Sequence, residues 1–176
     1  VTERRASEDY VILNQLLAET FDEMERIAKG VGPEGVLSGF RDLDKLTNGF
    51  HPSNMIVIAA RPAVGKSTLA LDIVRNAAIH EKKTAVIFSL EMSRSEITMR
   101  MLSAEARVAL NNIRSGVLSD DEWARLARRM GEISDAPLFI DDSPNLSMME
   151  IRAKARRLKQ RHDLKLIVID YLQLMS

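Results

Sequence analysis

The chain has 176 residues, and its 25 lysine and arginine residues balance its 25 aspartate and glutamate residues. This length fits one ordinary domain with a buried core, and the 45% hydrophobic and 28% charged fractions are typical of globular proteins. Without a net charge, any polyanion site must come from local clustering. The absence of cysteine excludes disulfides and thiolate metal sites. No apolar run is long enough to predict a membrane span.

The two ends of the chain predict a fragment of a longer protein. The N-terminus VTERRASEDY lacks the apolar core of a signal peptide and does not begin with methionine. The C-terminus IVIDYLQLMS stops just after a predicted strand. The lack of cysteine is compatible with a reducing compartment, and we expect a cytoplasmic protein.

The first predicted element is an amphipathic helix. Apolar residues recur every three or four positions from Ser7 to Lys29, a helix of about 34 Å. Three glycines and a proline in GVGPEG (Gly30–Gly35) predict a linker after it. The apolar stripe must pack on its own domain or on a neighbouring molecule, and the linker favours the neighbour.

Apolar runs then alternate with helical patterns. Three helices open with Ser-x-x-Glu, a pair that can satisfy backbone donors reciprocally. Trp123 and the methionines 99, 101, 148 and 149 are expected in the core. Non-alternating strands between helices predict an α/β fold, with a parallel sheet covered on both faces. The predicted strands are Met55–Ala59, Thr84–Leu90, Pro137–Asp141 and Leu164–Asp170, and the predicted helices are Gly65–Ile79, Ser93–Ala109, Ser119–Met130 and Ser147–Arg161.

The segment ARPAVGKS matches the spacing of a phosphate-binding loop, except that Ala60 replaces the first glycine. The amide groups of such a loop surround a phosphate at a helix N-terminus. Lys66 would supply charge to the β- and γ-phosphates, and the Ser67 hydroxyl would bind Mg²⁺. Alanine is the smallest change from glycine and leaves the amide donors in place. The predicted nucleotide-binding residues of the loop are Ala60, Arg61, Pro62, Ala63, Val64, Gly65, Lys66, Ser67 and Thr68.

Two carboxylates are expected at the same sheet edge as this loop. Asp170 ends a strand, where an aspartate can hold Mg²⁺. Tyr171 follows it, so the carboxylate that activates water must come from elsewhere. Glu91, in FSLEMS, is the candidate base, and the alternative is a loop glutamate that supports the next helix. Arg100 is expected to pair with Glu91 or a phosphate, unless it is a surface arginine.

A basic segment, Ile151–His162, could suggest nucleic-acid binding. It carries no aromatic residues between its charges, and an apolar stripe formed by Met148, Ile151, Ala155 and Leu158 would pack on the sheet. We therefore interpret its charges as a solvated face. The three histidines are scattered, so no metal site made of protein ligands alone is predicted.

Several motifs together resemble the ATPase domain of the bacterial replicative DNA helicase of the DnaB type. These motifs are ARPAVGKSTLALDI, FSLEMS, MRML, IRAKARRLKQ and IVIDYLQLM, and GFRDLDKLTNGFHPSNM resembles the entry into that domain. The resemblance runs from about Ser7 to the end of the chain. It implies a RecA-like P-loop NTPase fold with a mostly parallel sheet, incomplete at its C-terminal side. The implied roles are Lys66 and Glu91 in catalysis, Ser67 and Asp170 on Mg²⁺, and Arg100 and Gln173 as sensors of the nucleotide.

The resemblance also implies ATP-driven movement of a homo-hexameric ring along single-stranded DNA, with unwinding at the replication fork. It divides the chain into a linker helix that docks on the adjacent subunit (1–30), a Gly/Pro linker (31–35) and the first part of the ATPase domain (36–176). Primase, the helicase loader and most DNA contacts would involve parts outside the chain, as would the arginine finger of the neighbour. Loss of that finger alone can cost about 10³ in rate or more, so we expect weak activity of this chain by itself.

Two alternatives stay open at this point. The chain could belong to another RecA-fold ATPase, of the recombinase or repair type, which requires no closed ring. It could also be a nucleotide-dependent scaffold that binds ATP without hydrolysis and recruits a partner through its first helix.

Overall fold

The structure of the chain is a computed structural model, and it describes residues 12–29 and 35–170. The chain divides into two compact units, with the boundary between Glu34 and Gly35. The first unit contains the helix α1 (Leu13–Ala28). This confirms the predicted helix in its described part, and the segment before Ile12 lies outside the described residues. Leu17, Phe21 and Met24 on α1 are each more than half exposed.

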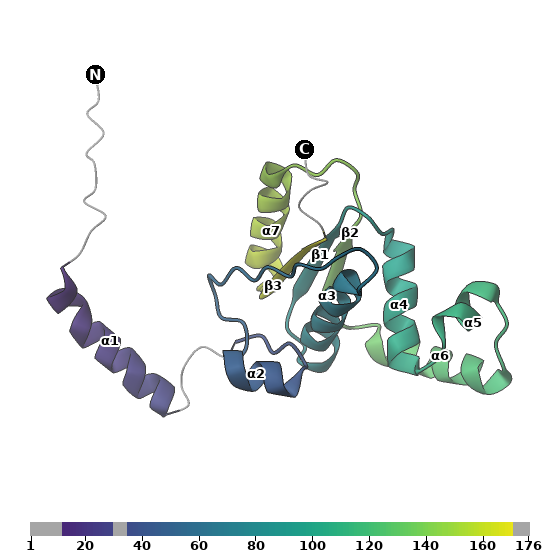
Figure 1. Cartoon of the computed structure of the whole chain (residues 1–176), viewed down its shortest axis with the longest axis horizontal. Coiled ribbons are helices and arrows are strands. Elements are labelled where there is room, and N and C mark those ends of the chain that lie inside the picture. Colours follow the sequence, from purple (N-terminus) through teal and green to yellow (C-terminus); the bar gives the residue numbers. More distant parts are fainter. Residues whose placement is uncertain (1–11, 30–34, 171–176) are drawn as a thin grey trace, which may run out of the picture. The chain divides into compact units, whose positions relative to one another are not determined.

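The second unit is built on a parallel sheet of three strands in the order β2-β1-β3 (Figure 1). β1 (Ala85–Ser89) lies in the middle, between β2 (Leu138–Asp141) and β3 (Leu166–Asp170). In this register Ile87 faces Ile140 on one side and Val168 on the other. The central strand is buried along its whole length, so it forms the spine of the core.

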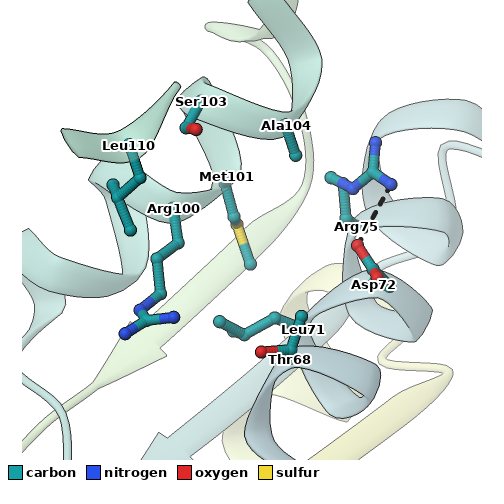
Figure 2. A pocket seen from close by; sticks show the side chains of 9 residues that line it. All are labelled: Thr68, Leu71, Asp72, Arg75, Arg100, Met101, Ser103, Ala104 and Leu110. Atoms are coloured by element: carbon teal, nitrogen blue, oxygen red, sulfur yellow. Dashed lines mark hydrogen bonds and ion pairs between the residues drawn. The ribbon is translucent and has the colours of Figure 1, made fainter. Parts of the chain in front are cut away.

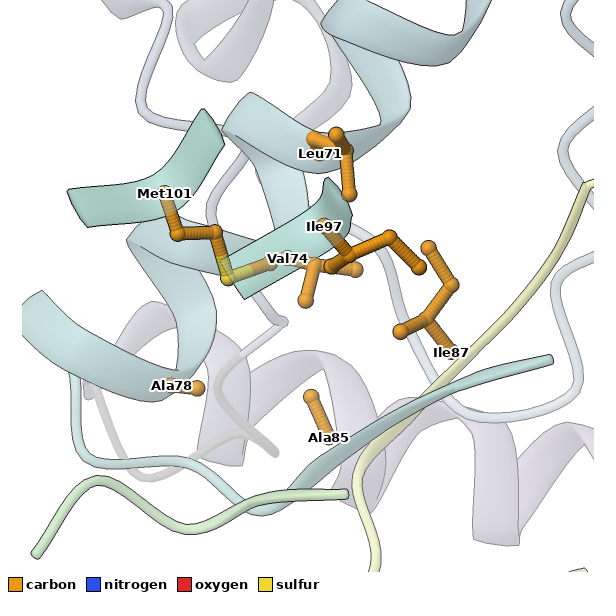
Figure 3. Packing of buried hydrophobic residues seen from close by; sticks show 7 residues of the cluster. All are labelled: Leu71, Val74, Ala78, Ala85, Ile87, Ile97 and Met101. Atoms are coloured by element: carbon orange, nitrogen blue, oxygen red, sulfur yellow. The ribbon is translucent and has the colours of Figure 1, made fainter. Parts of the chain in front are cut away.

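Helices cover both faces of this sheet, as predicted. Ala85 and Ile87 point to one face, where they pack against α3 (Lys66–Arg75) and α4 (Arg94–Ala106) (Figure 3). Val86 and Phe88 point to the other face and pack against α7 (Met148–His162). The remaining helices are α2 (Arg41–Thr47), α5 (Leu110–Ser115) and α6 (Asp120–Ile133). None of the helices in the described ranges is long and apolar enough to cross a membrane.

One predicted strand is wrong. The run Met55–Ala59 has no regular secondary structure, and it joins no strand of the sheet among residues 35–170. Met55 and Val57 are 80% and 71% exposed. The run has the apolar composition of a strand, but a strand also needs a neighbour to bond its amide and carbonyl groups.

The predicted core is only partly correct. Met101 is buried between α3 and α4, but Trp123, Met148 and Met149 are 58%, 55% and 83% exposed. The helix α6 packs on α4 rather than on the sheet, and it buries Leu126 there. Met148 and Met149 stand in the first turn of α7, before the residues of that helix that contact the sheet.

Two of the three predicted capping pairs form completely. At the starts of α6 and α7, Ser119 and Ser147 exchange hydrogen bonds with Glu122 and Glu150. At the start of α4, the Ser93 hydroxyl accepts from the amide of Glu96. The Glu96 carboxylate does not return the bond, because it pairs with two arginines instead. The third reciprocal pair was therefore predicted wrongly.

The helix α3 ends in a π-helical turn, η1 (Asn76–His80). In an α-helix residues five apart lie about 140° apart around the axis, whereas an i→i+5 turn brings them to the same side. Arg75 and His80 both reach the buried carboxylate of Glu105 on α4, Arg75 Nη1 at 2.6 Å and His80 Nε2 at 3.1 Å. Through these two side chains, the turn anchors the end of α3 to α4.

Candidate functional site

The carboxyl ends of β1 and β3 meet at one edge of the sheet. Ser89 is in register with Asp170, and the amide of Leu90 donates to the Asp170 carbonyl over 2.8 Å. Glu91 follows directly. Ligands of open parallel sheets bind at this edge, and α3 packs beside β3. The structure therefore places the two predicted carboxylates at neighbouring strand ends.

The predicted phosphate loop is an exposed turn that enters α3 at Lys66. Its backbone takes positive φ at Ala63 (63°) and at Gly65 (102°). A side chain at Gly65 would meet nothing within 4 Å, so glycine serves the backbone conformation rather than a lack of space. Ala60 has no positive φ. This explains why alanine is tolerated in place of the usual first glycine.

The first turn of α3 offers its amide groups to an anion. Gly65 is the N-cap, and no side chain caps the helix there. The first four amides of a helix lack partners within the helix, and its dipole favours negative charge at this end. Neither an acidic residue nor a capping side chain competes for these donors in the first turn.

Lys66 and Asp170 lie together in the structure. The Lys66 Nζ is 3.5 Å from Asp170 Oδ1, and the Asp170 side chain is only 4% exposed. The other oxygen, Asp170 Oδ2, is buried and has no hydrogen-bond partner among the described residues. A buried carboxylate oxygen without a partner is costly, so this atom fits contact with a cation.

These residues fit Mg²⁺ better than a metal held by protein alone. Residues 12–29 and 35–170 contain no group of three or more histidine or acidic side chains that could enclose an ion. Mg²⁺ usually takes one or two protein oxygens and completes its shell with phosphate and water. Asp170 Oδ2 and the Ser67 hydroxyl, one residue after Lys66, are suitable oxygens.

Glu91 lies in a short turn after β1 and is exposed. The hydroxyl of Ser89 donates to the Met92 carbonyl at 2.7 Å and accepts from the Met92 amide at 3.0 Å. These bonds close the turn beneath Glu91. The carboxylate can therefore meet a water molecule at the sheet edge.

Arg100 does not pair with Glu91, which corrects one of the two predicted partners. Its Nε donates to Glu96 Oε1 over 2.7 Å, because Glu96 lies one turn earlier on the same helix. Arg100 lines a hollow of about 180 Å³ between α3 and α4, together with Thr68 and Leu71 (Figure 2). Gln173 lies outside the described residues.

The cluster around Glu96 was not predicted from the sequence. Besides Arg100, Arg114 of α5 donates to the same carboxylate oxygen. Burial acts to raise the pKa of Glu96, but the hydrogen bonds from the two arginines outweigh burial and hold that pKa below its usual value. The i, i+4 spacing of Glu96 and Arg100 was a usable signal. Arg114 had none, because its approach depends on how α5 packs on α4.

The basic face of α7 is exposed as predicted. Ile151 and Ala155 are buried against the sheet, whereas Arg152, Arg156 and Arg157 are exposed. Lys154 is partly buried and bonds Asp141 over 2.6 Å.

A parallel sheet with a glycine-lysine-serine turn opening α3 and carboxylates at the strand ends defines an α/β domain of the P-loop class. The sequence profile of the DnaB-like helicase C terminal domain matches residues 35–176. This is more than half of the chain, and the chain belongs to that family.

Similar proteins agree with this assignment. The replicative DNA helicase DnaB of Leifsonia xyli subsp. xyli (strain CTCB07) is 54% identical over the whole chain, and that of Geobacillus stearothermophilus is 43% identical. The chain spans 39% of the length of each of these two proteins.

Solved structures confirm the RecA-like α/β fold. One solved ATPase domain is 30% identical to this chain with a TM-score of 0.81, covering 96% of this chain and 60% of that one. A structure of a DnaB-like replicative helicase and its interactions with primase is 29% identical with a TM-score of 0.83, covering 97% of this chain and 41% of that one.

Proposed function

We propose that this chain is the nucleotide-binding part of a replicative DNA helicase that hydrolyses ATP. Membership of the helicase family and the names of the relatives support this proposal. The observation that carries it is the buried Asp170 carboxylate, which has Lys66 Nζ 3.5 Å from one oxygen and no described partner on the other. The second oxygen is therefore available to a cation.

The proposed chemistry divides among four groups of the site. The amides of the loop and the Lys66 ammonium bind the β- and γ-phosphates, while Ser67 and Asp170 hold the metal. Mg²⁺, when bound, neutralises charge that develops on the phosphates. Glu91 orients the attacking water and accepts its proton. Because Glu91 is exposed at the strand edge, it is free to approach a terminal phosphate.

The proposed assembly follows from the family and from α1. We propose that residues 1–30 form a linker helix that docks on the adjacent subunit, that 31–35 connect it, and that 36–176 belong to the ATPase domain. The exposed apolar stripe on α1 supports docking. The full-length protein would work in the cytoplasm as a homo-hexameric ring on single-stranded DNA. Primase and a loader would bind through parts outside this chain; one related helicase is described with its interactions with primase.

The test uses the full-length protein and measures DNA-stimulated ATP turnover together with nucleotide binding. Lys66→Ala should abolish binding of ATP. Glu91→Gln should keep binding but lower turnover about 10²- to 10⁴-fold, the usual contribution of a general base. Asp120→Asn, on the exposed first turn of α6, is the matched control and should keep turnover within twofold. Full turnover in Glu91→Gln would remove Glu91 from its role, and ATP binding in Lys66→Ala would overturn the site.

A further inference from the structure

The carboxylate of Glu96 has two possible uses, and the structure selects one of them. Its sequence context, Ser-x-x-Glu, is the same as at Glu122 and Glu150, which both bond back to their serines over 2.9 Å. Glu96 instead turns its Oε1 to Arg100 Nε and to Arg114. The start of α4 therefore lacks the hydrogen bond from the Ser93 amide to the Glu96 carboxylate. Two arginines from different helices have replaced one local bond.

The hydrogen bond between Arg100 and Glu96 uses only one nitrogen of the guanidinium group. Glu96 takes the Nε, and the two terminal nitrogens of Arg100 have no hydrogen bond within the described part of the chain. Figure 2 shows that the Arg100 side chain leaves α4 on the side where Thr68 and Leu71 of α3 lie. Thr68 follows Ser67 directly, so the hollow that Arg100 lines adjoins the first turn of the phosphate-loop helix.

The position of Glu96 also directs Arg100 toward the sheet edge. Side chains on a helix lean toward its N-terminus, and the bond to a residue four positions earlier fixes the guanidinium one turn closer to that end. The N-terminus of α4 begins three residues after Glu91. The phosphate nearest Glu91 in the proposed site is the terminal one, since that is the phosphate that water attacks.

Charge keeps this arrangement cationic. Glu96 is 21% exposed and lies between Arg100 at 35% and Arg114 at 44%. Two guanidiniums against one carboxylate leave one positive charge for an anion. Arg114 also supplies the second partner that the carboxylate needs in order to stay charged and fixed when Arg100 engages a ligand.

We infer that Glu96 is a positioning residue for the γ-phosphate of ATP: it holds Arg100 through Nε so that the terminal nitrogens face that phosphate, and Arg114 holds Glu96. This inference rests on the proposed function. A plain i, i+4 ion pair would only add a little helix stability and would have no bearing on nucleotide choice.

The test is the ratio of affinities for β,γ-imido-ATP and ADP in the full-length protein. Glu96→Gln keeps the shape and helix propensity but weakens the hold on Arg100. It should lower the ratio about tenfold, the scale of one lost charge-assisted hydrogen bond, with the Kd for ADP within twofold of wild type. Arg100→Gln should lower the ratio at least as much. The double variant should fall no further than Arg100→Gln, because Glu96 acts through Arg100.

One matched control and one graded variant separate positioning from folding. Glu150→Gln removes a carboxylate from the same Ser-x-x-Glu context on α7, which packs on the other face of the sheet, and should leave the ratio within twofold. Arg114→Gln should lower the ratio less than Glu96→Gln, since it loosens Glu96 without removing it. An unchanged ratio in Glu96→Gln, or independent losses in the double variant, would overturn this inference and leave the proposed function standing. Failure of the wild-type protein to bind either nucleotide would overturn the proposed function as well.

Discussion

Two apolar runs, Met55–Ala59 and Ala85–Ser89, both lead into loops of the candidate site, and only the second is a strand. Val86 and Ile87 in β1 are 1% and 0% exposed, whereas Met55 and Val57 are 80% and 71% exposed. Both sequences are rich in valine and isoleucine. The difference is that β1 has a bonded strand on each side. Residue type fits a segment for a sheet, but the presence of a partner decides whether it joins one.

Amide hydrogen exchange should show the largest difference between the two runs. Ladder hydrogen bonds protect the amides of Val86, Ile87 and Phe88, which open only with the core. Their exchange should be slower than that of Ile56 and Val57 by about 10³-fold or more. Exchange read by mass spectrometry or NMR measures this. Equal protection would mean that the 55–59 segment has found a strand partner.

Core truncation should separate the runs by the next largest amount. Ile87→Ala should lower the free energy of unfolding by about 2–5 kcal/mol, because it leaves a cavity at the centre of the sheet. Val57→Ala should change it by about 0.5 kcal/mol or less, as for other exposed positions. Urea denaturation followed by circular dichroism gives both values. The comparison fails if the two losses are alike.

The same contrast between complete and incomplete bonding can be tested at helix starts. Ser147→Ala removes the serine of a full capping box and should cost about 1 kcal/mol. Ser93→Ala should cost about half as much, because Glu96 has already left that cap for Arg100 and Arg114. Urea unfolding of the two variants is the measurement. A larger loss for Ser93→Ala would show that the cap of α4 needs no reciprocal bond.

The smallest expected effect concerns the pKa of Asp163, which lies between α7 and β3. Hydrogen bonds from Lys159 and Lys165 lower the pKa of Asp163 from its usual 3.8 to about 2. A lowered pKa in the folded state gives stability that is present above pH 3.8 and is lost as the pH falls through about 2. An NMR titration of the side chain should show the low pKa. Asp163→Asn, which suits the positive φ of this residue, should remove this part of the acid dependence.

The sequence predicted those parts of the fold that depend on local patterns. The helices at Ser93, Ser119 and Ser147 begin where their capping serines stand, and β1, β2 and β3 lie in the predicted apolar runs. The short helices α2 and α5 were missed, because seven and six residues are too few for a clear period.

The site divides in the same way. The spacing of the phosphate loop and the strand-end position of Asp170 could be read from the sequence, and the structure brings Lys66 and Asp170 together. The partner of Arg100 could not be read, because the choice between Glu91 and Glu96 depends on the direction in which the side chain leaves α4. Arg114 and the buried Glu105 required the packing of α3, α5 and α6 around α4, which no local pattern encodes.

The π-helical turn at the end of α3 makes the length of this segment matter more than its composition. Removing one residue, such as Ala77 or Ala78, would turn His80 by about 100° around the helix axis and take it away from Glu105. A substitution that keeps small side chains would leave the spacing between phosphate loop and central strand intact. Insertions and deletions between Arg75 and Glu81 should therefore be far less tolerated than point changes there.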